Sequence, residues 1–178
     1  MLKSFYFFII LVIAYLTGLT LGIFCDIDDF FVNDSYVTES ADVLLDLQSL
    51  APFERSIYIA ENNLIVAFKI LVLGIFSFGI FSAILLLYNG FILGVAIGES
   101  LELLSINIIA KSTLPHCGEI LGLIICGYVG YILSMFLIFR VKYCSIYSIF
   151  KWCMLGFMLI IVSAVIESYI SFPSNSSF

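Results

Sequence analysis

Long apolar runs separated by short polar stretches make up most of the chain. The first run follows Lys3, and further runs begin near Leu64, Pro115 and Ile149. A helix that crosses the ~30 Å hydrocarbon core of a bilayer needs about 20 apolar residues, and these runs are long enough. The pattern therefore predicts an all-α fold, a polytopic bundle of transmembrane helices.

The apolar run of residues 64–98 is too long for one crossing, since a single helix of that length would extend about 50 Å. Tyr88-Asn89-Gly90 is the turn signal within the run, and we place a break there. The result is a single membrane domain, residues 1–178, with about five spans. The predicted spans are residues 4–24, 64–87, 91–104, 115–139 and 149–170. Because the third is short, we expect it to cross with help from its neighbours or to be partly re-entrant.

Positive residues orient this bundle, because cytoplasmic loops of membrane proteins are enriched in lysine and arginine. Arg55 and Lys111 fall on one side of the predicted membrane. The positive residues on the other side are Lys3, Arg140, Lys142 and Lys151. We therefore expect a multi-pass protein of the cell membrane with a cytoplasmic N-terminus. The C-terminus and the loop of residues 25–60 are then external.

Composition agrees with a membrane protein and narrows its partners. The chain is 63% hydrophobic and 11% charged, whereas soluble domains have roughly 25% charged residues. Its net charge of −6 is concentrated in the predicted external loop. A segment with that charge would be repelled by nucleic acid and by anionic lipid, whereas the apolar spans make the lipid bilayer the general partner. Within the loop, residues 43–50 fit a short amphipathic helix or, equally well, a solvated segment.

Small residues recur every four positions in three of the predicted spans. Gly18 and Gly22 lie in the first span, and Gly90, Gly94 and Gly98 run from the predicted break into the third. Those in the fourth are Gly118, Gly122, Cys126, Gly130 and Ser134. Such stripes let helix backbones approach closely, which drives helix association in lipid. We predict that the fourth span packs tightly on another helix, with the third as the expected partner.

Ionisable residues near one end of the spans form a second pattern. They are costly inside a membrane, so each is a candidate for function. The predicted intramembrane polar cluster consists of Lys69, Glu99, His116, Glu119 and Glu167. Lys69 and Glu119 lie at matching depths, so we predict an ion pair between them, with Glu99 or Glu167 as the alternative acid. The competing interpretation is that these charges extend individually to the lipid headgroups.

The segment STLPHCGEILG, residues 112–122, holds the only histidine of the chain, His116. One histidine with carboxylates is a poor zinc ligand set, and Cys117 points about 100° away around a helix. Neither a His-Glu-x-x-His motif nor a phosphate-binding loop is present. We therefore predict no catalytic residue, no metal and no cofactor. The segment is interpreted as the polar outer mouth of the fourth span, with Pro115 as its first helical residue.

Three short motifs, in this order, resemble the Stage II sporulation protein M family. The residues that carry the resemblance are Asn62 and Asn63, then Tyr88, Asn89, Gly90 and Gly94, then Leu114, Pro115, His116 and Glu119. The similarity is strongest from Glu61 to Ser134. Members of that family have glycine directly after the histidine and glutamate four residues beyond it. Here Cys117 follows His116, and Glu119 comes after three residues.

The resemblance implies a multi-pass membrane protein without catalysis. In spore formers the family's namesake resembles a scaffold that holds peptidoglycan-degrading partners at the membrane. Other relatives look like accessory components beside transport ATPases, including those that export circular bacteriocins. Two hypotheses remain: a non-catalytic scaffold or assembly subunit of a membrane complex, which we favour, and a membrane component of a peptide or small-solute exporter with a separate ATPase. Expected partners are other membrane proteins, such as an ABC-type ATPase or a cell-wall hydrolase complex, and further copies of the chain.

Overall fold

The computed structural model describes residues 2–25, 50–141, 143 and 145–170, and all the regular structure in these ranges is helical. The helices are α1 (Leu2–Ile23), α3 (Pro52–Phe76), α4 (Ile80–Leu103), α5 (Ile106–Thr113), α6 (His116–Phe139) and α7 (Ile146–Ile170). All but α5 are long and apolar enough to cross a membrane, which gives five candidate spans. The predicted all-α, multi-pass bundle is therefore confirmed.

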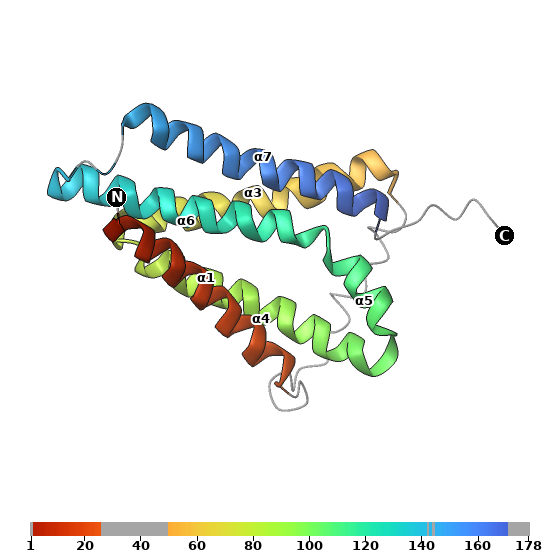
Figure 1. The fold of residues 1–178 in the computed structure, drawn as a ribbon. Coiled ribbons are helices and arrows are strands. Elements are labelled where there is room, and N and C mark those ends of the chain that lie inside the picture. Colours follow the sequence, from red (N-terminus) through yellow and green to blue (C-terminus); the bar gives the residue numbers. More distant parts are fainter. Residues whose placement is uncertain (1, 26–49, 142, 144, 171–178) are drawn as a thin grey trace.

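The helices form two groups that meet at α6. Helix α1 packs along α4, while α3 and α7 pack on each other and on α6, which also contacts α1 and α4 (Figure 1). Helix α6 is accordingly the most enclosed of them, with almost every residue from Gly122 to Gly130 buried. The short α5 lies at the end of the bundle where α6 begins (Figure 1).

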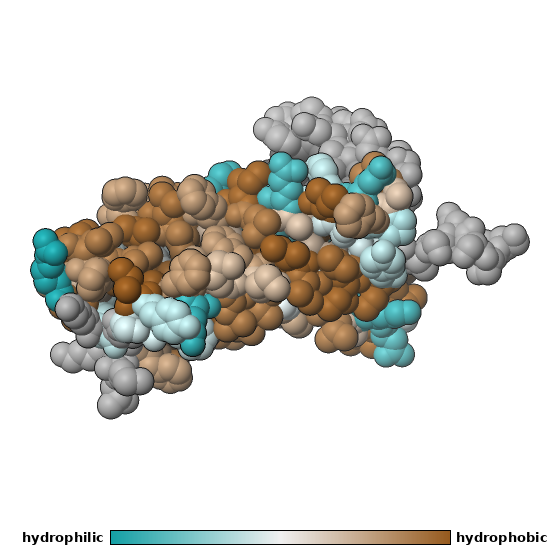
Figure 2. Space-filling model, turned by 90° about the horizontal axis from the view of Figure 1, so that it is seen from above, coloured by the Kyte–Doolittle hydropathy of each residue, from teal (hydrophilic) through white to brown (hydrophobic). Residues whose placement is uncertain are grey.

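Large apolar side chains cover much of the outer surface. Figure 2 shows hydrophobic residues over most of the face in view. They include Phe68 on α3, Ile84 on α4 and Phe150 on α7, each more than half exposed. In water such a surface would be costly, but in a bilayer it faces lipid. The surface therefore agrees with the multi-pass assignment.

The turn between the second and third spans lies at Ser77-Phe78-Gly79, not at Tyr88–Gly90 as predicted. Gly79 has a φ of 83°, in the left-handed region that glycine adopts without steric cost. Its backbone N–H donates to the Gly74 carbonyl at 2.8 Å and closes the end of α3. Apolar residues flank this turn on both sides, so the sequence marks it only weakly.

The predicted break falls instead inside α4. There the Asn89 side-chain amide donates to the Leu85 carbonyl, one helical turn earlier, at 2.8 Å. Gly90 lies where α4 meets the backbone of α1 at Tyr15. The third span consequently covers Ile80–Leu103, and it is long enough for a full crossing rather than short or re-entrant.

Helix α3 begins at Pro52 rather than at residue 64, so part of the predicted external loop is helical. Proline suits the first turn of a helix because its missing N–H has no partner there. The Glu54 carboxylate accepts a hydrogen bond from the Ala51 N–H at 3.4 Å and helps to start the helix. Residues 26–49 of the acidic loop, which include all but the last residue of the predicted amphipathic segment, lie outside the described residues. At α6, Pro115 precedes the first helical residue instead of occupying that position.

The glycine stripes are contact surfaces, as predicted, but the third and fourth spans are not each other's main partners. The stripe of α4 meets Gly18 and Gly22 of α1, where a Cβ on either glycine would overlap backbone atoms of α4. The stripe of α6 is divided between two helices. Gly118 and Gly122 face α7 at Ser163 and Ile160, and Gly130 faces the α3 backbone at Leu71.

Substituting Gly122 tests the α6–α7 contact. A Cβ at this position would lie 2.7 Å from the Gly156 carbonyl oxygen and 2.6 Å from Ile160 Cγ1. Gly122→Leu is therefore expected to lower the free energy of unfolding by about 1–3 kcal/mol, as overpacking usually does. Thermal unfolding in detergent measures the effect. The melting temperature of Gly122→Ala should lie between those of the wild type and Gly122→Leu. The exposed neighbour Leu121 provides the control, because Leu121→Ala should change stability little. Equal melting of Gly122→Leu and the wild type would contradict the contact.

Candidate functional site

One cavity collects polar side chains from five helices at the end of the bundle where α3 and α6 begin. Its volume is about 440 Å³. The polar residues that line it are Tyr15, Tyr58, Asn62, Asn63, Asn89, His116, Glu119 and Glu167. In a bilayer a polar cavity of this size is exceptional, because unsatisfied polar groups in hydrocarbon are costly. It is therefore the candidate functional site.

The three motifs that are far apart in the sequence meet in this cavity. Asn62 and Asn63 come from α3, Asn89 from α4, and His116 and Glu119 from the first turn of α6. His116 and Glu119 were predicted to share a polar cluster, whereas the three asparagines were noted only as motif positions. A signal was present: each motif places an amide, imidazole or carboxyl group inside a predicted membrane helix or beside one.

The other motif residues build the surroundings of the cavity. Gly90 and Gly94 pack on α1, and Pro115 is buried immediately before α6. Tyr88 and Leu114 are exposed. The motif positions thus divide into groups that line the cavity, groups that hold helices together, and groups on the outside.

His116 lies between two glutamates from different helices. Its Nδ1 is 3.2 Å from Glu119 Oε2, one turn further along α6, and its Nε2 is 3.5 Å from Glu167 Oε1 on α7. The i, i+3 spacing that predicted a shared face for His116 and Glu119 is confirmed. The imidazole therefore links the start of α6 to the end of α7.

Each glutamate keeps one oxygen without a partner among the described residues. These atoms are Glu119 Oε1 and Glu167 Oε2, both buried. The side chains are correspondingly enclosed, with exposed fractions of 8% for Glu119 and 13% for Glu167. A buried carboxylate oxygen without a donor or a cation is destabilising. Both atoms are thus free to accept a hydrogen bond or to coordinate a cation.

Lys69 and Glu99 do not join this group. Lys69 is exposed and lines a separate groove between α3 and α7, together with Glu61 and Phe157. Glu99 is exposed on α4. The predicted Lys69–Glu119 pair is wrong, because the ion-pair partner of Glu119 within the described ranges is His116. The two residues also lie at different depths: α3 begins at Pro52, and Ile70, next to Lys69, packs near Gly127 of α6, about two helical turns beyond Glu119. For Lys69, exposure fits the alternative of extension to the headgroups.

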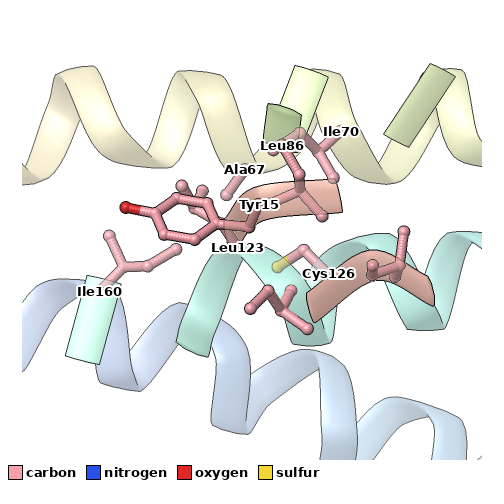
Figure 3. Packing of buried hydrophobic residues seen from close by; sticks show 9 residues of the cluster. Tyr15, Ala67, Ile70, Leu86, Leu123, Cys126 and Ile160 are labelled. Carbon is pink, nitrogen blue, oxygen red and sulfur yellow. The ribbon is translucent and has the colours of Figure 1, made fainter. Parts of the chain in front are cut away.

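Buried apolar residues close the inner end of the cavity. Tyr15 and Leu123 line the cavity and also belong to this hydrophobic cluster. Its side chains come from α1, α3, α4, α6 and α7, and most of them are labelled in Figure 3. The cluster consists of Leu11, Tyr15, Ala67, Ile70, Leu86, Leu123, Ile124, Cys126 and Ile160. The polar site is thus confined to one end of the bundle.

Arg55 connects two helix ends close to the site. It is only 5% exposed, although it was predicted to lie in the external loop of residues 25–60. Its guanidinium donates to the Ser168 carbonyl of α7 at 3.3 Å and to the Leu50 carbonyl at 3.0 Å. Ser168 directly follows Glu167, so Arg55 fixes the part of α7 that carries one of the site carboxylates.

Comparison with known families identifies the same relationship as the motifs. The family described as Stage II sporulation protein M matches residues 4–172, which is nearly the whole chain. No curated protein and no solved structure matches the chain.

Proposed function

The chain belongs to the Stage II sporulation protein M family, and from this premise we propose that it is a non-catalytic membrane subunit that acts by assembling with other membrane proteins. Its partners are then an ABC-type ATPase or a cell-wall hydrolase complex in the cell membrane, with further copies of the chain as an additional possibility.

The closed inner end of the polar cavity carries this proposal. A solute that entered at the polar end would meet the cluster around Leu11, Ile70 and Leu86 before it reached the other side. Beyond the cavity, buried Ser82 and Ser134 use their hydroxyls to donate to backbone carbonyls at 2.8 Å. The described part of one chain therefore offers no continuous polar route across the bundle. This supports a role exerted through partners.

The cavity itself favours a second candidate, a membrane component of a peptide or small-solute exporter that works with a separate ATPase. Charged groups near the mouth of such a component bind or gate a substrate. The ionisable groups of the cavity are His116, Glu119 and Glu167. The two glutamates are largely buried, which is costly unless a bound group compensates their charge.

Reciprocal purification with each partner tagged separates the two candidates. An assembly subunit is expected to retain the same membrane proteins in two unrelated detergents, with either side tagged. If the complex exports a substrate, Glu119→Gln should lower export only in proportion to the amount of complex that is lost. If Glu119→Gln instead stops flux in proteoliposomes while the complex is recovered in full, the exporter role replaces the assembly role. Failure to recover any reciprocal partner would contradict the assembly role.

The orientation follows from the positive residues and can be tested at two exposed serines. Ser105 precedes α5, and Ser145 precedes α7 at the opposite end of the bundle. In a background without Cys25, Cys117 and Cys144, an impermeant thiol reagent is expected to label Ser105→Cys in intact cells. Ser145→Cys should react only after lysis, because the residues near it are expected to be cytoplasmic. The reverse labelling pattern would invert the topology.

A further inference from the structure

We infer that His116, Glu119 and Glu167 bind a divalent transition-metal ion in the polar cavity. One potential ligand atom from each residue lies within 4.8 Å of the other two. Ions such as Zn²⁺ hold nitrogen and oxygen ligands at about 2.0–2.2 Å, so ligands on opposite sides of one ion are roughly 4 Å apart. Small side-chain rotations therefore bring the three groups into one coordination sphere.

The unpartnered oxygens supply an independent reason for a cation. Glu119 as a whole residue is only 6% exposed, and its Oε1 has no hydrogen-bond partner in the described residues. Glu167 Oε2 is likewise buried and has no hydrogen-bond partner in the described residues. His116 contacts one oxygen of each carboxylate, and even when protonated it balances only one of two negative charges. A dication would instead balance both carboxylates, because an imidazole that ligates a metal is neutral, and it would also bind the open oxygens.

The donor set decides between classes of cation. Mg²⁺ and Ca²⁺ prefer oxygen ligands throughout, whereas imidazole nitrogen suits first-row transition metals. One imidazole with two carboxylates therefore favours a first-row transition metal, and with a single nitrogen donor it suits Mn²⁺ or Fe²⁺ better than Zn²⁺. Three protein ligands leave coordination positions open for water. Tyr15, Asn62 and Asn89 line the same cavity and provide hydroxyl and amide groups for such water molecules.

The sequence prediction of no metal treated one histidine with carboxylates as a poor zinc ligand set, and it brought only two of the donors together in one segment, residues 112–122. Within that segment His116 and Glu119 are indeed only two donors. The third comes from Glu167 on α7, which the sequence grouped with Lys69 and Glu99 by depth only. Neither assembly with partners nor export by itself requires a bound metal, so the inference goes beyond the proposed function.

Metal content after removal of loose ions tests the inference on the full chain. Protein purified in detergent is treated with a chelator, incubated separately with Zn²⁺, Mn²⁺ or Mg²⁺, and passed through gel filtration. We expect about one transition-metal ion per chain, a raised melting temperature, and little Mg²⁺. His116→Ala, Glu119→Gln and Glu167→Gln should each reduce affinity at least about tenfold. Glu99→Gln removes an exposed carboxylate from the same half of the bundle and should bind as the wild type does.

Two outcomes would overturn the site. One is metal retention that survives all three substitutions together, since the ion would then belong elsewhere, such as the acidic stretch between the first two spans. The other is a wild-type chain that retains no transition metal. X-ray absorption of the metal-loaded wild type provides a test that does not depend on whether the variants fold. An imidazole nitrogen with oxygen ligands is expected, and a shell of oxygen alone would contradict the assignment.

Discussion

Gly18→Leu is expected to destabilise the protein more than Gly122→Leu does. A Cβ at Gly18 would overlap the Leu87 carbonyl oxygen of α4, and the Leu87 carbonyl carbon would lie 2.8 Å away. These are backbone atoms of a continuous helix, so they cannot rotate away as a side chain does. We expect a loss of at least about 3 kcal/mol in the free energy of unfolding, the upper end of the usual cost of overpacking.

Thermal unfolding in detergent and the amount of folded protein in membranes both measure this effect. Thr17→Leu is the matched control, because it adds a similar side chain at the exposed neighbouring position. The control should melt close to the wild type. If Gly18→Leu and Thr17→Leu melt together, the close approach of α1 and α4 at this point is not what stabilises the bundle.

Arg55→Met is expected to have the second-largest effect. The substitution keeps much of the length and volume of the side chain but removes the donors to the Ser168 and Leu50 carbonyls. Hydrogen bonds from charged groups contribute about 1.5–3 kcal/mol to stability. Without Arg55, the Ser168 carbonyl would lose the guanidinium as a donor at a buried position. We therefore expect a loss of that order in the free energy of unfolding.

The end of α7 should also become more open in this variant. Hydrogen exchange at residues 165–170 is expected to speed up, whereas the middle of α6 stays protected. Lys111→Met serves as the control, since it removes an exposed positive charge from α5 at the same end of the bundle. Unchanged exchange near Ser168 in Arg55→Met would show that the guanidinium does not hold α7 in place.

The sequence predicted the class and number of spans well because both depend on the length of apolar runs. It misplaced the turn between α3 and α4 because Tyr88-Asn89-Gly90 is the stronger local turn signal. The packing of α4 on α1 favours a helical conformation at Tyr88–Gly90. In the actual turn, Gly79 adopts the left-handed conformation. Tertiary packing thus overrode local propensity.

The same distinction explains the site. The contact of His116 with Glu119 was predictable, because three residues along one helix fix the two side chains on one face. The approach of Glu167 was not predictable in this way, since it depends on the rotation of α7 about its own axis. Glycine stripes likewise identify a contact face on α4 and on α6 but say nothing about which helix covers it.

The pairing of α1 with α4 has a consequence for biosynthesis. The ribosome makes α1 first, then α3, and only afterwards the helix that covers Gly18 and Gly22. At roughly 5–20 residues per second, several seconds separate the synthesis of Gly22 from that of Gly90. During this interval the small-residue face of α1 has only lipid or another membrane protein against it. Assembly of this bundle is therefore completed late, when α4 enters the membrane and meets a helix that has been waiting there.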